Sequence, residues 1–183
     1  MSNTLSIQIS DEGFTASLQR LLEHGGDTST LTFLIGQGIE ERIDARFASS
    51  TGPDGQQWDD NRPATLAREA LRLALSKGNR RKDGSLNKRG TERLAAKKPL
   101  IGETGTLRNQ IAALADGAGV TVTAGATVYA AIQQFGGTRA EFSHLWGDIP
   151  ARPFMPVTPD GDLYPTEAEA IMADLNDFFA GLA

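Results

Sequence analysis

The strongest constraint on how this chain can fold is the hexapeptide IPARPF at residues 149–154, in which two prolines lie three positions apart. Each proline fixes its own φ and pushes the residue before it towards extended backbone. We therefore predict a stiff, unpaired strand that holds Arg152 and Phe154 in set directions. Little conformational entropy is left to lose there, which suits an anchor placed against a neighbouring subunit. The alternative is a rigid edge strand whose phenylalanine is buried in its own chain.

The residues before this hexapeptide add to the predicted contact. Apolar residues from Val128 to Phe135 are spaced for one side of a short helix or bent strand, and two glycines end that element because glycine enters left-handed backbone without steric cost. Large apolar residues then interrupt a polar loop at 138–148, where they either fold back or meet a partner. The candidate interface comprises Tyr129, Phe135, Gly136, Gly137, Phe142, Leu145, Trp146, Pro150, Arg152, Pro153 and Phe154.

Periodicity elsewhere predicts an α+β fold, with an antiparallel sheet covered by amphipathic helices. A length of 183 residues suits a single domain spanning 1–183. An unpaired sheet edge can recruit the same edge of another copy, and a repeated head-to-tail contact closes a ring if the rotation permits. We expect strands at 5–9 and 120–124, and helices at about 10–25, 29–49, from 63, from 104 or 106 to 115, and from 165, the last with a capping box at Thr166 and Glu169.

Half of the basic residues are concentrated in one segment. Residues 77–98 hold nine of the eighteen, against Asp83 and Glu92, which gives a local charge of +7 and leaves −12 for the rest. Interspersed glycines and asparagines predict a flexible basic loop. It is either simply solvated, or it contacts DNA or an acidic partner, and phosphate contact would make binding salt dependent. The candidate contact residues are Arg80, Arg81, Lys82, Lys88, Arg89, Arg93, Lys97 and Lys98.

No catalytic, cofactor-binding or metal-binding site is predicted. Glu141, His144 and Asp148 match neither a zinc spacing nor a catalytic triad. The GETGT sequence at 102–106 lacks the Lys-Ser/Thr of a phosphate loop. Cysteine is absent, which excludes thiol catalysis and disulfides, and no apolar run approaches the roughly 20 residues of a membrane span. A cytoplasmic origin without membrane contact is expected.

Two local features have two interpretations each. Trp58 is a large aromatic residue among polar neighbours, so it is either a plug docked onto the domain or an anchor for a partner. Gly36 and Gly38 either mark close packing of the 29–49 helix or merely weaken that helix, by about 1 kcal/mol each relative to alanine.

Four ordered motifs carry a resemblance to a known family. Trp58 before PATLA at 63–67, KPLI at 98–101 before TGTLR at 104–108, YA at 129–130 with IQQFGG at 132–137, and the IPARPF hexapeptide cover about residues 10–160. The chain resembles the phage virion morphogenesis family, the Mu-like G protein and tail completion group. The long basic segment between residues 68 and 97 is where the chain departs most from the family pattern.

The resemblance implies a function in virion assembly. It implies a non-enzymatic structural protein of the phage neck or tail end that completes the tail and supports head-tail joining. The expected partners are its own copies, in a ring that we expect to be a hexamer, other tail or neck and connector proteins, and DNA in the channel. The protein would be in the virion, and in the host cytoplasm during assembly. The alternative is a nucleic-acid-contacting module that acts through residues 77–98.

Overall fold

The computed structural model describes residues 6–8, 28–102, 104–125, 129–145 and 147–180. The helix predicted at 10–25, together with Val128 and Trp146, lies outside the described residues. In chain order the elements are β1 (Ser6–Gln8), α2 (Thr28–Ser49), α3 (Pro63–Ala74), the 3-10 turn η1 (Lys77–Asn79), α4 (Lys88–Ala95), α5 (Thr106–Asn109), β2 (Ala112–Asp116), β3 (Gly119–Thr123), α6 (Ala130–Phe135) and α7 (Pro165–Ala180).

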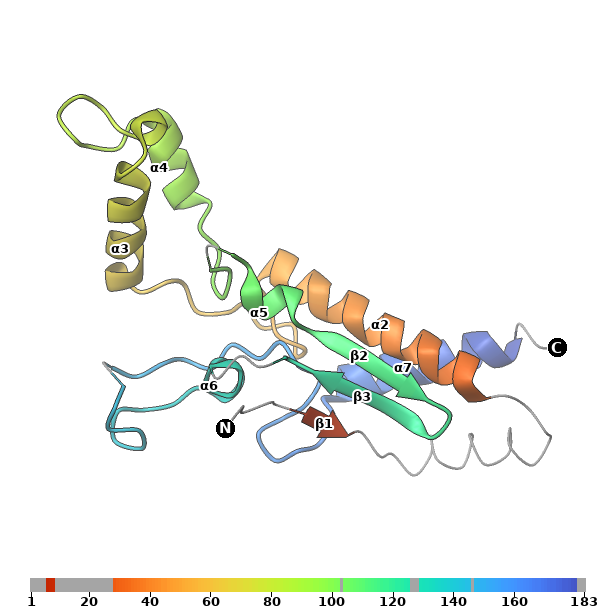
Figure 1. Ribbon diagram of the computed structural model, residues 1–183. Coiled ribbons are helices and arrows are strands. Elements are labelled where there is room, and N and C mark those ends of the chain that lie inside the picture. The colour runs from red at the N-terminus through yellow and green to blue at the C-terminus, as the bar shows by residue number, and fades with distance from the viewer. Residues whose placement is uncertain (1–5, 9–27, 103, 126–128, 146, 181–183) are drawn as a thin grey trace.

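The strands form one antiparallel sheet in the order β1-β3-β2. Ile7 pairs with Val122 on one side of β3, and Ala113 pairs with Val122 on the other. The β2–β3 turn is closed by the Asp116 carboxylate, which accepts hydrogen bonds from the backbone N–H groups of Ala118 and Gly119 at 2.8 and 2.9 Å. Helix α2 packs against β2 and β3, and α7 packs against α2 (Figure 1). The α+β fold and the predicted strands around residues 7 and 122 are confirmed.

Helix α2 is the central element of the core. Its apolar stripe, predicted from the sequence, is buried at Leu31, Ile35, Ile39, Ile43 and Phe47, each at most 2% exposed. Leu34, the other leucine of this helix, is 45% exposed and lies off this stripe.

The glycines of α2 mark close packing. A Cβ built on Gly36 would lie 3.4 Å from the Cβ of Ala113 on β2 and 3.5 Å from Val120 on β3. A Cβ on Gly38 would lie 2.8 Å from the Asp174 carboxylate on α7. The structure therefore supports close approach at both glycines, towards the sheet and towards α7.

The helix predicted from residue 104 or 106 to 115 is wrong over its second half. Helix α5 ends at Asn109, and Ala112–Asp116 is the edge strand β2, on which Leu114 is 65% exposed. The alanine-rich sequence favours a helix locally. A strand forms instead, because a tight turn brings these residues beside β3, whose β-branched residues favour strand pairing.

The β2 edge is partly occupied by α2. The Thr32 hydroxyl donates to the Asp116 carbonyl at 2.7 Å, the Thr28 hydroxyl donates to the Gly117 carbonyl, and the Glu40 carboxylate accepts from the Ala113 N–H. Edges blunted in this way resist pairing with a second copy. Recruitment of this edge by another copy would have to displace those contacts.

Residues 77–98, predicted to be a loop, contain the turn η1 and helix α4 and belong to a helical arm. We call residues 63–98 the arm; its helices α3 and α4 project away from the sheet (Figure 1). The Asn87 side chain caps α4 by accepting from the Gly90 N–H at 3.0 Å, and its own N–H donates to the Asn79 carbonyl. A Cβ on Gly90 would lie 2.3 Å from the Asn79 carbonyl oxygen. Asn79, Asn87 and Gly90, whose residue types favoured a loop, therefore form the close contacts between η1 and the start of α4.

The capping box predicted for the last helix is also wrong. Helix α7 begins at Pro165, one residue earlier, so Thr166 lies inside it, and its hydroxyl donates to the Pro53 carbonyl at 2.5 Å.

Across the described residues, no helix combines the length and hydropathy that crossing a membrane requires.

Candidate functional site: the braced segment and the basic arm

We call residues 149–154 the braced segment, because other parts of the chain hold its backbone. Ile149 and Gly137 exchange two backbone hydrogen bonds of 2.7 and 2.9 Å, and the Arg152 N–H donates to the Gln133 carbonyl at 2.8 Å. A Cβ on Gly136, whose φ is +75°, would lie 2.9 Å from the Ala151 nitrogen, so only glycine fits this close approach. The prediction of an unpaired strand is wrong: an isolated bridge between Gly137 and Ile149 pairs the segment, and residues 149–154 are not one of the strands of the sheet.

The Gln134 side chain holds the end of this segment from inside the core. It is 1% exposed, and its Oε1 accepts from the backbone N–H groups of Phe154 and Met155 at 2.8 and 2.9 Å. Its Nε2 donates to the carbonyls of Met155 and Val157 at 3.4 and 3.0 Å. The Gln134 amide therefore supplies the hydrogen bonds that a neighbouring strand would otherwise make to this backbone. Prolines in the segment lack an N–H group and so hinder regular strand pairing there.

An aromatic cluster anchors the same segment. The Phe47 ring lies 5.5 Å from the rings of both Trp58 and Phe154, and Trp58 is only 4% exposed. The indole N–H of Trp58 donates to the Pro153 carbonyl at 2.9 Å. Of the two interpretations of Trp58, docking onto its own domain is therefore the one that the structure supports, because both its ring and its indole N–H contact residues of the same chain.

Replacing Trp58 with phenylalanine is expected to destabilise the fold by about 1–2 kcal/mol. The ring contact with Phe47 is largely kept, but the Pro153 carbonyl loses its donor and the smaller ring leaves a space. Urea denaturation followed by circular dichroism measures this change. A loss as large as that of Trp58→Ala, which removes the ring as well, would contradict this estimate, because it would show that the hydrogen bond and not the ring volume dominates.

The expectation that Arg152 and Phe154 point at a neighbouring subunit is wrong, because both side chains are buried in their own chain. Phe154 is fully buried, and Arg152 is 7% exposed. The Arg152 guanidinium donates to the backbone carbonyls of Asp59 and Asp60, both at 2.9 Å. Burial lowers the pKa of Arg152, and the charge of Asp59 acts in the opposite direction. Both side chains therefore hold their own chain together.

A buried ion-pair network links α2, α7 and the braced segment. Glu167 is 1% exposed and accepts from Arg42 at 2.6 Å and from Arg46. Arg46 also donates to the Phe154 carbonyl at 2.9 Å, and Arg42 donates to Asp174. Burial alone would lower the pKa of Arg42, but its hydrogen bonds and charge contacts with Glu167 and Asp174 raise it overall.

The other candidate interface residues have different positions. Tyr129, Phe135 and Phe142 are 41%, 36% and 43% exposed, and so remain available to a partner. Leu145, Gly136, Gly137, Pro150 and Pro153 are half-buried. An interface role for the exposed aromatic residues stays a prediction.

The carboxylates near His144 are engaged in local turns. Glu141 accepts from the backbone N–H and the hydroxyl of Thr138 at 2.9 and 2.8 Å, which lowers its pKa. Asp148 accepts from the Arg139 N–H at 2.8 Å. Among the described residues no group of three or more histidine and acidic side chains is arranged to hold a metal ion.

The arm separates the candidate basic residues into two sets. Arg80, Arg81, Lys82, Lys88, Arg89 and Arg93 are exposed on the arm. Lys97 and Lys98 lie at its base, where their ammonium groups donate to the carbonyls of Ile101 and Ala48. They line a cleft of about 300 Å³ together with Tyr129 and Arg152. Lys97 and Lys98 thus fasten the arm to the body.

Sequence reasoning missed Gln134, Glu167 and Arg46. The available signal was a pair of glutamines, Gln133 and Gln134, inside an otherwise apolar run, and the sequence does not indicate which of the two is buried. The pairing of Glu167 with Arg46 joins residues 121 positions apart, and no local pattern indicates it.

These features define a small α+β protein with an internally braced segment and a projecting basic arm. The model of the phage virion morphogenesis family matches residues 9–164, so the chain belongs to that family. It is therefore a phage structural or assembly protein. No curated protein and no solved structure matches the chain.

Proposed function

We propose that this protein is a non-catalytic component of the phage neck or tail end. It forms a ring of identical copies that completes the tail and supports head-tail joining, and it stays in the virion. The observation that carries the proposal is the family match over residues 9–164. A second support is the braced segment, whose hydrogen bonds to Gln134 and Trp58 give a rigid body that can be stacked without ordering cost.

Exposed aromatic residues supply surface for such a ring. Tyr129, Phe135 and Phe142 lie on the same stretch of chain as the braced segment, and aromatic side chains dominate the energetics of many interfaces. We expect the ring to be a hexamer, and its neighbours to be tail or connector proteins.

Native mass spectrometry of the purified protein, alone and with tail tubes, tests this proposal. The expected result is a closed oligomer of one size that binds one end of the tube. Phage particles that lack the protein should accumulate as separate heads and tails, and added protein should restore joining. A protein that stays monomeric and does not bind tubes would contradict the proposal.

The basic arm favours one alternative, a module that contacts DNA in the channel. Phosphate contacts make affinity fall steeply with salt. If arm deletion leaves ring assembly and joining intact but abolishes retention of a DNA duplex in a salt-dependent manner, the DNA role is the better account. Loss of assembly itself favours the structural role.

A further inference from the structure

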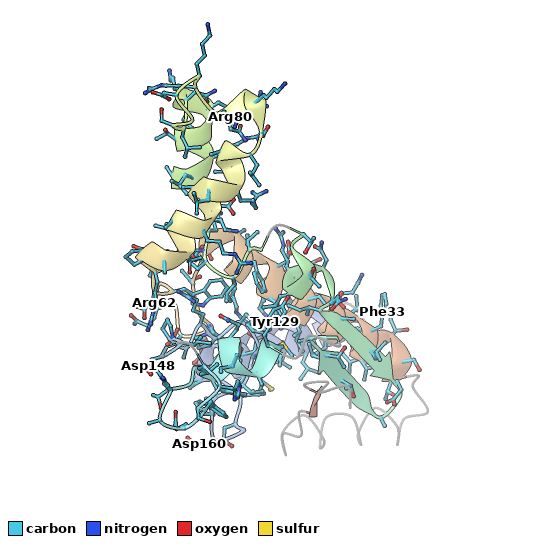
Figure 2. All side chains as sticks on the ribbon, turned by 60° about the vertical axis from the view of Figure 1, so that its left-hand side comes forward. Phe33, Arg62, Arg80, Tyr129, Asp148 and Asp160 are labelled. Atoms are coloured by element: carbon cyan, nitrogen blue, oxygen red, sulfur yellow. The ribbon has the colours of Figure 1, made fainter. Side chains whose placement is uncertain are left out.

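The positive charge of the chain is concentrated in the arm, and its negative charge is spread over the rest of the chain. The arm carries eleven basic side chains against three acidic ones, a net charge of +8, which leaves −13 for the rest of the chain. Figure 2 shows Arg80 near the free end of the arm, with Asp148 and Asp160 at the opposite end of the molecule. Such a separation favours contact between unlike ends of two copies.

The arm also exposes apolar surface. Leu71 and Leu75 are 73% and 81% exposed, the highest values among the large exposed apolar side chains of the described residues. They lie four positions apart, on the same side of the polypeptide at the end of α3. The arm already has its own small core at Leu73, Asn79 and Gly90, so its folding does not require the two exposed leucines.

The opposite end offers a matching surface, which we call the acidic end. It comprises two loops, residues 138–145 with 147–148 and residues 158–162; among these described residues the exposed charged side chains are Glu141, Asp148, Asp160 and Asp162 against Arg139. Phe142, at 43% exposed, supplies apolar area there. One end of the chain is therefore basic with leucines, and the other is acidic with an aromatic ring.

We infer that the arm of one copy docks on the acidic end of the next copy. The arm places its cations beside the carboxylates, and Leu71 and Leu75 beside Phe142. Because the two surfaces differ, the contact is heterologous, and repetition generates a ring or an open filament. The inference rests on the proposed ring and names the surfaces that join its copies. Since the charges are exposed, raising the salt concentration weakens the contact.

Charge reversal at each end, followed by mixing, tests the docking in the full-length protein. One variant carries Arg80→Glu and Lys82→Glu, and the other carries Asp160→Lys and Asp162→Lys. The first variant turns the charge of residues 80–83 from +2 to −2, and the second turns that of residues 158–162 from −2 to +2. Each variant alone therefore sets like charges against each other at these positions and should raise the dissociation constant of assembly roughly 100-fold. An equimolar mixture should assemble again, because each reversed arm now meets a reversed acidic end. Analytical ultracentrifugation measures all three samples.

A matched control carries the same change in net charge away from the acidic end: Glu41→Lys with Asp177→Lys, both exposed on α2 and α7. It should assemble as the wild type does. A second variant, Leu71→Ser with Leu75→Ser, should weaken assembly without changing net charge, and its circular dichroism reports whether the arm is folded.

The outcomes separate the inference from the proposed function. If both charge-reversed variants still form rings of the wild-type size, the docking inference is wrong and the ring proposal still holds. Reversed arms that still assemble but no longer retain a DNA duplex overturn it in favour of DNA contact. A wild-type protein that is monomeric at every concentration overturns both proposals.

Discussion

Replacing Glu167 with glutamine is expected to lower the free energy of unfolding by about 3–5 kcal/mol, because Arg46 then loses its buried counter-charge and Arg42 keeps only Asp174. Glu167 is 1% exposed and binds both Arg42 and Arg46. Arg46 in turn holds the Phe154 carbonyl at 2.9 Å, so the loss extends from the helix pair to the braced segment. Urea denaturation followed by circular dichroism measures the change.

The control is a surface ion pair of the same chemistry. Arg108 and Asp44 are joined at 2.6 Å between Nη2 and Oδ2, but the Asp44 side chain is 57% exposed. The Arg108 hydrogen bond lowers the pKa of Asp44, and solvent screens most of that interaction. Asp44→Asn should therefore cost no more than about 1 kcal/mol. Equal losses in Glu167→Gln and Asp44→Asn would show that burial does not govern the network.

Replacing Gln134 with alanine should cost about 2–6 kcal/mol. The N–H groups of Phe154 and Met155 would lose their acceptor inside the core, and each unsatisfied group costs about 1–3 kcal/mol. Hydrogen exchange should show faster exchange of these two amides than of amides in β3. Gln133→Ala, a half-buried neighbour whose side chain makes none of these four bonds, is the matched control.

Gln134→Glu separates the hydrogen bonds from side-chain volume. The ionised carboxyl can accept from Phe154 and Met155, but it faces the carbonyls of Met155 and Val157 without a donor. Burial raises the pKa of the introduced carboxyl above its unfolded value of about 4.3. Its stability contribution is therefore present below that value and lost as the pH rises through the folded pKa. The variant should approach the wild type near pH 4, and a deficit independent of pH would contradict the donor role.

The braced segment shows how far sequence reasoning reached. Two prolines and two glycines drew attention to this segment, because these residues restrict or free the backbone wherever they occur. The predicted strand is nevertheless not unpaired, since Gly137 and Ile149 form a bridge. They carry no information about which way Arg152 and Phe154 point. The structure turned both side chains inward, onto the carbonyls of Asp59 and Asp60 and onto Phe47.

The arm and strand β2 show where local signals misled. Glycine and asparagine at residues 78–90 indicated a loop, yet Asn79, Asn87 and Gly90 build a capped helical turn. An alanine-rich stretch at 112–115 indicated a helix, yet it pairs as a strand with β3. In both places the stabilising partner belongs to a neighbouring element, and the periodicity of a single element carries no information about that contact.

The amino-acid sequence by itself determined the α+β class, the buried stripe of α2, the rigid backbone at residues 149–154 and the family. These properties depend on local backbone restriction, hydrophobic period and ordered motifs, all of which are present along the chain. Only the tertiary structure decided that Gln134, Arg46 and Glu167 hold that segment from within, and that the basic residues stand on a projecting arm. Those contacts join residues 20 to 121 positions apart, and their energy depends on burial, which exists only once the chain has folded.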